Sequence, residues 1–276
     1  MAPVAPPFID GTSKGGIAAQ IVAMLPAHSH YVEPFGGAVS VLLSKRPAKL
    51  EIVNDLDGDL VAFWRCVRDR PSDLMRACAL TPHSRAELDD ALTRPDSLDE
   101  LERARRVWVC LSQGRNGIRP TGWRRTTQGV GSGSMSALLE TFVDDMAVVA
   151  RRLLNVSLEC RPAVEVISDY GGSRSTLFYV DPPAVSRGRS GAAGSARALA
   201  AALGKCRGAV VLRASSADAA LLEELYPDWN CHRLGNRGPG RGRAETLLWS
   251  NRELREPVRD EPLPLDFGAP ASAAGW

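Results

Sequence analysis

Apolar and polar positions follow two different periods along the chain. Before residue 61 and again after residue 155, short apolar runs alternate with amphipathic stretches. The runs predict strands at 31–35, 51–55, 156–160, 177–180 and 209–212. The amphipathic stretches predict helices at 17–25, 38–45, 162–170, 196–203 and 217–225. Strands that alternate with helices in this way predict an α/β fold.

The middle of the chain is helical in pattern throughout. Apolar positions recur three and four residues apart at 57–70, 71–80, 84–92, 98–111 and 138–154. We therefore expect an α/β domain built from 8–60 and 156–252, interrupted by a helical insert at 61–155.

Two further segments lie near the end of the α/β part. Residues 229–234 and 246–250 predict an antiparallel pair that closes the domain. Residues 1–7 and 256–276 are rich in proline and alanine, and we expect both tails to be disordered.

Charge directs attention to one stretch. The 276 residues carry a net charge of only +2, so any affinity for nucleic acid must come from local clustering. Seven arginines and no acid lie between Arg103 and Arg125. Such a cluster is typical of phosphate binding, although charge runs more often form a solvated face. Glycines, Gln113 and Trp123 in the same stretch favour a contact loop, whose candidate DNA-binding residues are Arg115, Asn116, Arg119, Arg124 and Arg125.

Cysteine spacing and hydropathy exclude several classes of protein. The six cysteines are widely spaced and include no Cys-x-x-Cys, which argues against a zinc site and a disulfide framework. They are interpreted as reduced thiols, mostly buried. No secretion signal opens the chain, and no apolar run is long enough to cross a membrane. We expect a soluble, cytoplasmic protein with no bound metal.

An apolar run ends abruptly at Asp181-Pro182-Pro183-Ala184. Each proline fixes its own φ and lacks an N–H, so the turn presents one carboxylate and a carbonyl without a competing donor. In open α/β sheets, ligands bind at the carboxyl ends of strands. The sequence resembles the Asp/Asn-Pro-Pro-aromatic loop of amino-methyltransferases, in which these two acceptors bind the hydrogens of an exocyclic amine. A chance Asp-Pro-Pro at a strand end is the alternative.

A second candidate site follows the strand at 31–35. Gly36 and Gly37 allow the backbone to approach a ligand closely, and Asp55 ends the next strand nineteen residues after Gly36. An acid in that place suits two ribose hydroxyls. Glu33 would repel a phosphate and suits a cationic ligand. These features favour a nucleoside site of Rossmann type, with a generic glycine turn as the alternative.

Five segments in the same order closely resemble the D12-class (Dam-like) adenine-N6 DNA methyltransferases. They are Ser-Lys-Gly at 13–15, Tyr-Val-Glu-Pro-Phe-Gly-Gly at 31–37, Val-Asn-Asp-Leu-Asp-Gly-Asp-Leu at 53–60, Tyr-Val-Asp-Pro-Pro at 179–183 and Glu-Thr-Leu-Leu-Trp-Ser-Asn at 245–251. The resemblance covers about residues 8–252. It implies a Rossmann-like S-adenosylmethionine-dependent methyltransferase fold in which the helical insert recognises the DNA target.

The resemblance also implies a role for each matching residue. The residues expected to bind S-adenosylmethionine are Lys14, Glu33, Phe35, Gly36, Gly37, Asp55 and Asp181. Asp181 and the Pro182 carbonyl, on the turn completed by Pro183 and Ala184, are expected to bind the target amine of a flipped adenine in double-stranded DNA. We expect a monomer, and the resemblance leaves a restriction endonuclease partner open.

The chain departs from this pattern where base stacking matters. Ala184 stands in place of the aromatic that follows Pro-Pro in the family, and Arg213-Ala214-Ser215 stands where the family often has a tyrosine. Base–aromatic stacking is worth about 1–3 kcal/mol. The alternative functions are therefore an impaired relative that binds cofactor or DNA, and methyl transfer to an amine in RNA or on a protein glutamine.

Overall fold

The computed structural model describes residues 4–8, 17–93, 95, 97–125, 134–184, 192–234 and 245–255. These residues form a seven-stranded sheet in the order β3-β2-β1-β4-β5-β7-β6. Its strands are β1 (His30–Glu33), β2 (Leu50–Asn54), β3 (Val156–Glu159), β4 (Thr176–Val180), β5 (Ala209–Ser215), β6 (Asn230–Leu234) and β7 (Thr246–Ser250). The pairs among β1 to β5 are parallel, and β7 runs antiparallel to both β5 and β6. The predicted α/β fold and antiparallel closing pair are confirmed.

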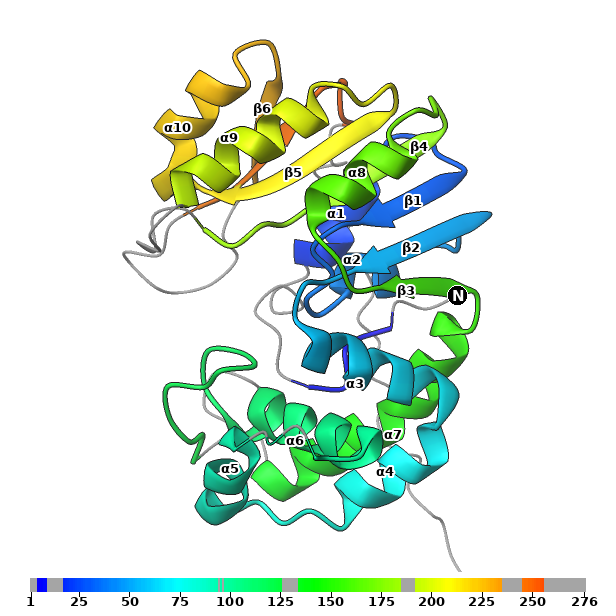
Figure 1. The fold of residues 1–276 in the computed structure, drawn as a ribbon, viewed down its shortest axis with the longest axis vertical. Coiled ribbons are helices and arrows are strands. Elements are labelled where there is room, and N and C mark those ends of the chain that lie inside the picture. The colour runs from blue at the N-terminus through cyan, green and yellow to red at the C-terminus, as the bar shows by residue number, and fades with distance from the viewer. Residues whose placement is uncertain are drawn as a thin grey trace, which may run out of the picture.

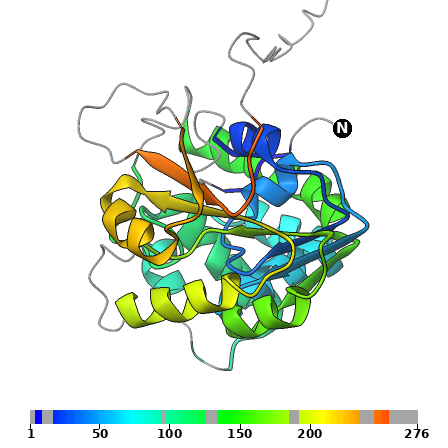
Figure 2. The same cartoon turned by 90° about the horizontal axis from the view of Figure 1, so that it is seen from above.

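Helices cover both faces of this sheet, because the central strands are apolar on both sides. All of β4 is buried, and its side chains alternate between two hydrophobic clusters. One face packs against α8 (Ala163–Tyr170), α9 (Ala192–Leu203) and α10 (Ala219–Leu225). The opposite face packs against α1 (Ile17–Met24) and α2 (Ser40–Ser44) (Figures 1 and 2).

Between β2 and β3 the described residues form five helices, which lie together at the end of the molecule away from the sheet (Figure 1). They are α3 (Gly58–Asp69), α4 (Pro71–Ala79), α5 (Arg85–Leu92), α6 (Glu100–Gln113) and α7 (Met135–Leu153). Asp57, Ser84, Asp99 and Ser134 accept hydrogen bonds from the first backbone amides of α3, α5, α6 and α7 and so fix where these helices begin. The helices expected in this segment are present. The domain boundaries at 60/61 and 155/156 stay a prediction.

One hydrophobic cluster runs from the sheet into these helices. It joins Tyr31 and Leu42 to Phe63 and Trp64 of α3 and onward to Trp108 of α6. A buried ionic cluster reinforces the connection: Arg152 at the end of α7 bonds both oxygens of Glu51 on β2, at 2.6 and 2.9 Å, and Lys45 bonds Glu51 at 2.6 Å. The helical part and the sheet therefore share one core.

The predicted disorder of residues 1–7 is wrong for residues 4–7. Pro6, Pro7 and Phe8 are buried, and the Trp108 indole donates a hydrogen bond to the Pro7 carbonyl at 2.9 Å. Phe8 packs against Phe63 and Trp64, with ring centroids 5.8 and 5.6 Å apart. A proline-rich composition gives no sign of a tertiary partner 101 residues away. Residues 1–3 and 256–276 lie outside the described residues.

Two other predictions concern the whole chain. All six cysteines are free thiols, but only Cys66, Cys78 and Cys110 are buried, while Cys160 and Cys231 are exposed. In the described ranges no helix combines the length and apolarity that crossing a membrane requires.

Candidate active site

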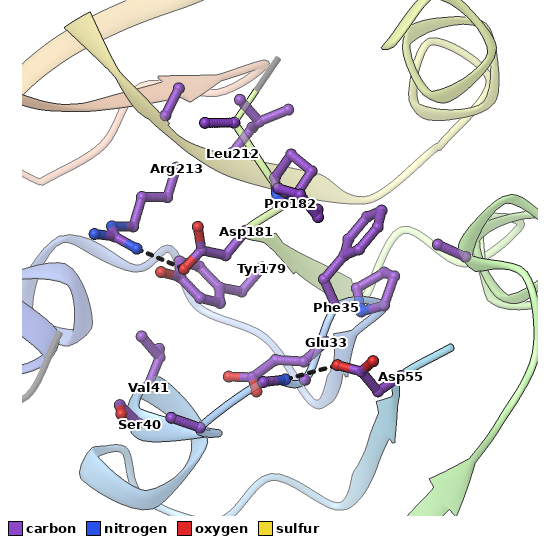
Figure 3. A pocket seen from close by; sticks show the side chains of 18 of the residues that line it. Glu33, Phe35, Ser40, Val41, Asp55, Tyr179, Asp181, Pro182, Leu212 and Arg213 are labelled. Carbon is purple, nitrogen blue, oxygen red and sulfur yellow. Dashed lines mark hydrogen bonds and ion pairs between the residues drawn. The ribbon is translucent and has the colours of Figure 1, made fainter. Parts of the chain in front are cut away.

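A cavity of about 1010 Å³ opens at the carboxyl ends of β1, β2, β4 and β5. The strand order reverses between β1 and β4, because β2 and β3 continue on one side of β1 and β5 follows on the other. Ligands of open α/β sheets bind at such a switch point. Segments at and after these four strand ends line the cavity, with Arg119 from the helical part. The Asp-Pro-Pro turn and the glycine turn thus share one cavity (Figure 3).

The turn after β1 brings the backbone unusually close to the end of β2. The Gly36 amide donates to the Asn54 carbonyl at 2.7 Å, and a Cβ on Gly36 would lie 2.6 Å from Val53 Cγ1. Gly37 has a φ of 50°. Val39 also has a φ of 48°, which is rare for a β-branched residue. Close approach therefore requires glycine at 36, and left-handed backbone favours it at 37.

We expect alanine at these two positions to have different effects. Gly36→Ala forces the buried Val53 side chain to shift, and overpacking of this kind lowers the free energy of unfolding by about 1–3 kcal/mol. Gly37→Ala meets nothing within 4 Å and bears only the left-handed backbone penalty of about 1–2 kcal/mol. Urea denaturation measures both. A ligand of this cavity should bind more weakly to Gly36→Ala than to Gly37→Ala, because only the change at 36 displaces residues at the end of β2. Equal loss of affinity in the two variants would contradict the proposed difference.

Glu33 lies at the inner wall of the cavity and is only 1% exposed. Its Oε1 accepts hydrogen bonds from the Tyr31 hydroxyl at 2.5 Å and the Leu42 amide at 3.0 Å. Burial, helped by the nearby Asp181 carboxylate, raises the pKa of Glu33 to about 8 against the lowering effect of these bonds and of Lys45. A buried acid of this kind favours a cationic ligand, since a positive charge would stabilise its ionised form.

Asp55 holds the glycine turn to the end of β2. Its Oδ2 accepts a hydrogen bond from the Gly37 amide at 2.9 Å (Figure 3). Its Oδ1 accepts one from the Asp57 amide, also at 2.9 Å. A carboxylate has about four acceptor positions, so two backbone donors leave capacity for ligand hydroxyls. The sequence pattern did not reveal this structural role of Asp55.

Asp181 faces the same cavity and forms an ion pair there. Arg213 Nη1 lies 2.7 Å from Asp181 Oδ2, and the two side chains are 24% and 28% exposed (Figure 3). Arg213 follows directly on Leu212, which pairs with Val180 in the register of β4 and β5. In the sequence, Arg213 stands out only as a departure from the family pattern, and nothing near it in the chain indicates that it pairs with Asp181.

Few aromatic side chains line the cavity around Asp181. Ala184 lines the wall with Pro182 and Pro183 and supplies no ring. Tyr179 is 4% exposed and packs in the hydrophobic core. Phe35 is half-buried and is the other aromatic residue in the described lining of the cavity.

The basic loop after α6 is a hairpin. Gly114 and Trp123 form an antiparallel bridge, and the Arg115 amide donates to the Gly122 carbonyl at 2.9 Å. Within the loop, Asn116 and Gly117 have left-handed φ values of 72° and 94°, and the Asn116 side-chain amide donates to the Thr121 hydroxyl at 2.8 Å. The hairpin exposes Arg115, Asn116 and Arg119, and Arg125 just beyond it is exposed as well.

Other residues of the basic stretch have structural partners. Arg103 pairs with Asp59, Arg105 with Glu87 and Glu102, and Arg106 with Asp90 and Glu102. These three arginines connect helices, so the interpretation of the whole cluster as a phosphate-binding footprint is wrong for them. Their acidic partners come from outside the acid-free stretch.

Two polar residues of the loop region also serve its own structure. Gln113 is fully buried and forms hydrogen bonds with Pro82 and Ser84, so it cannot contact DNA from this position.

The remaining candidates of the loop lie in different settings. Trp123 stacks on His83 at a centroid distance of 4.6 Å. Arg124 is half-buried beside them, and its carbonyl accepts a hydrogen bond from His83. Arg119 is 76% exposed and lies 3.9 Å from Asp57 at the cavity. Lys14 lies outside the described residues.

Comparisons with known proteins identify the family of this chain. A Type II methyltransferase, M1.LlaDCHI, from Lactococcus lactis subsp. cremoris is 24% identical over 269 aligned residues, which cover 81% of this chain and 87% of the relative. The sequence model of one family matches residues 13–188, which is more than half of the chain and includes both the glycine turn and the Asp-Pro-Pro turn. The chain belongs to the D12 class of N6 adenine-specific DNA methyltransferases.

Proposed function

We propose that this protein transfers a methyl group from S-adenosylmethionine to the N6 amine of adenine in double-stranded DNA. One observation carries the proposal: Asp181, on its rigid proline turn, lines the same cavity as Glu33, Gly36, Gly37 and Asp55. An acceptor for an amine and a site suited to a cationic nucleoside therefore adjoin each other.

The residues of the cavity fit S-adenosylmethionine. Its described lining includes six acids, and two arginines offset them only in part: Glu33, Asp55, Asp57, Asp181, Asp218 and Glu245, against Arg119 and Arg213. This excess of negative charge suits a ligand with a sulfonium and an ammonium group. Asp55 would bind the ribose hydroxyls, Glu33 the ammonium end, and Phe35, Gly36 and Gly37 would line the nucleoside. Lys14 belongs to the same proposed site by family resemblance.

S-adenosylmethionine supplies, when bound, a methyl group on a positively charged sulfur. Asp181 and the Pro182 carbonyl accept the two hydrogens of the amine, which turns the nitrogen lone pair away from the purine ring. As the new N–C bond would form and the bond between the methyl group and the sulfonium would break, a neutral thioether would leave, and the nitrogen would become positive and have to lose a proton. The Asp181 carboxylate stabilises that charge and accepts the proton.

The adenine must leave the base stack to reach this cavity. We propose that the hairpin binds the DNA around it, through Arg115, Asn116, Arg119, Arg124 and Arg125. Arg119 connects the two tasks, because it belongs to the exposed hairpin and also lines the cavity. The other arginines would contact phosphates without reading sequence.

Incubation of the protein with radiolabelled S-adenosylmethionine and mixed-sequence duplex DNA tests the proposal. We expect label on N6-methyladenine after digestion to nucleosides, and none in reactions with RNA or with a glutamine-containing protein substrate. Label on another acceptor, or on none, would remove the proposed function.

The affinity for S-adenosylmethionine should rise with pH between about 6 and 7.5. Glu33, with a pKa of about 8, is largely protonated in this range, and each pH unit increases its ionised fraction up to about tenfold. A cation binds the ionised form better, so the affinity measured by calorimetry should follow this fraction, and Glu33→Gln should flatten the curve of affinity against pH.

The stability of the protein should change with pH in the opposite sense. Folding raises the pKa of Glu33 from 4.5 to about 8, so the free energy of unfolding falls as pH rises from about 4.5 to 8.

An impaired relative that only binds cofactor or DNA is the second candidate, because Ala184 supplies no stacking ring and Asp181 is already paired. Ala184→Tyr should raise the methylation rate about tenfold or more if a missing stack limits it. Ala184→Leu, which adds bulk without a ring, is the control. Equal rates for both variants would mean that stacking at 184 is not limiting.

We further propose a role in restriction–modification, since the Lactococcus relative is a Type II methyltransferase. This role implies a cytoplasmic protein and, beside it, a restriction endonuclease that cuts the same sequence. A monomer suffices, because the proposed cofactor, base and DNA contacts all come from one chain.

A further inference from the structure

The ion pair between Arg213 and Asp181 follows from the register of the sheet. Leu212 of β5 pairs with Val180 of β4, so the next residue on each strand stands beside the other. Side chains alternate along a strand, and Tyr179 and Val211 both face the cluster that packs on α1 and α2. Arg213 and Asp181 share that face and meet at 2.7 Å. The pair is therefore built into the fold.

This pairing does not suit methyl transfer as the proposed function describes it. Asp181 would stabilise a nitrogen that becomes positive, but a guanidinium on the same carboxylate offsets its charge and repels the new one. Arg213 Nη1 also donates a hydrogen bond to Asp181 Oδ2, an acceptor that the target amine would need. The carboxylate should act best after this arginine has moved to another anion.

DNA supplies such an anion with the target base. An extruded nucleotide brings its own phosphate towards the cavity, and a guanidinium binds phosphate oxygens in the same bidentate way as a carboxylate. Arg213 lines the cavity and is 24% exposed, so part of its side chain is open to an incoming ligand.

We propose that Arg213 is an exchangeable partner of Asp181: it holds the carboxylate in the DNA-free protein and moves to a phosphate of the DNA when the target nucleotide enters. The inference rests on the proposed function and adds a positioning residue to it. Arg213 therefore favours substrates that carry a phosphate. A free base would have to break the ion pair with Asp181 and would offer Arg213 no new anion in return.

The salt dependence of DNA binding tests this exchange without any measurement of catalysis. The probe is a fluorescent duplex with one adenine opposite an abasic site, which lowers the cost of extrusion. Arg213→Met should reduce the slope of log Kd against log salt by about 0.9, the value of one lost phosphate contact. Arg213→Lys should keep the slope. Arg197→Met is the matched control, since Arg197 pairs with Glu224 on α9 and α10 and does not line the cavity.

Cofactor binding to the DNA-free protein tests the other half of the proposal. Arg213→Met should raise the affinity for S-adenosylmethionine about three- to tenfold, because the exposed carboxylate attracts the sulfonium. Affinity for S-adenosylhomocysteine, which lacks that charge, should stay unchanged. In an Asp181→Asn background, Arg213→Met should have a smaller effect on S-adenosylmethionine, because only the repulsion by the guanidinium is then removed.

Unchanged salt slopes, or equal effects on the two cofactor forms, would overturn the exchange while methylation by the wild-type protein still supported the proposed function. A wild-type protein that binds neither cofactor nor DNA would overturn both. A reduced slope together with an effect on the sulfonium form alone supports the inference.

Discussion

Replacing Asp181 by alanine is expected to lower the methylation rate at saturating cofactor by at least about 100-fold, the lower range for loss of a positioned proton acceptor. Asp181 is the acid on the turn that β4 presents to the cavity, and the two prolines after it fix its backbone. Without the carboxylate, nothing on the turn offsets the charge that develops on the amine. Single-turnover kinetics on duplex DNA measures this loss directly.

Two variants make the result specific. Asp181→Asn keeps an acceptor oxygen without the charge and should retain more activity than alanine. Asp218→Ala removes another acid of the same cavity, one that lies on the 3₁₀ turn after β5, and should change the rate at saturating cofactor less than about tenfold. If Asp218→Ala and Asp181→Ala are equally slow, the proposed role of the proline turn is wrong.

Replacing Arg152 by methionine should lower the free energy of unfolding by about 3–5 kcal/mol, the usual result of removing one partner from a buried ion pair. Arg152 and Glu51 have side chains that are each 2% exposed, and Arg152 also donates to the Leu42 carbonyl at 2.9 Å. Its loss leaves Glu51 with Lys45 as the remaining cation at this buried site. Chemical denaturation followed by tryptophan fluorescence measures the change.

Arg161→Met provides the matched control for Arg152→Met. Arg161 also pairs with two acids, Glu159 and Asp169, but its side chain is 34% exposed. Ion pairs in contact with water contribute about 0–1 kcal/mol, so this variant should unfold at nearly the wild-type denaturant concentration. Similar losses in both variants would mean that burial of the Glu51 cluster adds nothing to stability.

Much of the fold was predictable because its signals are local. Apolar runs and helical periodicity identified the strands and helices to within a few residues, and the Asp-Pro-Pro and Gly-Gly turns identified the two walls of the cavity. Asp181, Glu33 and Asp55 could be proposed as site residues because each ends a predicted strand or follows it directly. The order of parallel strands then brings their side chains together.

What the sequence could not reveal depends on contacts between distant segments. The partner of Asp181 is Arg213, 32 residues away, and only the register of β4 and β5 places them side by side. The pairing of Arg103, Arg105 and Arg106 likewise depends on helix packing, which a count of charges does not contain. The left-handed backbone at Val39 has no signal in the identity of valine.

The strand order has a consequence for synthesis on the ribosome. β1 is central in the sheet, and its neighbour on one side is β4, whose residues follow the whole helical segment. Until residue 180 has left the exit tunnel, one edge of β1 has no strand to pair with, and β2 likewise waits for β3. At about 5–20 residues per second this interval lasts several seconds. The nascent chain thus exposes apolar strand edges for that time, so this stage of translation is where we expect chaperones to bind it.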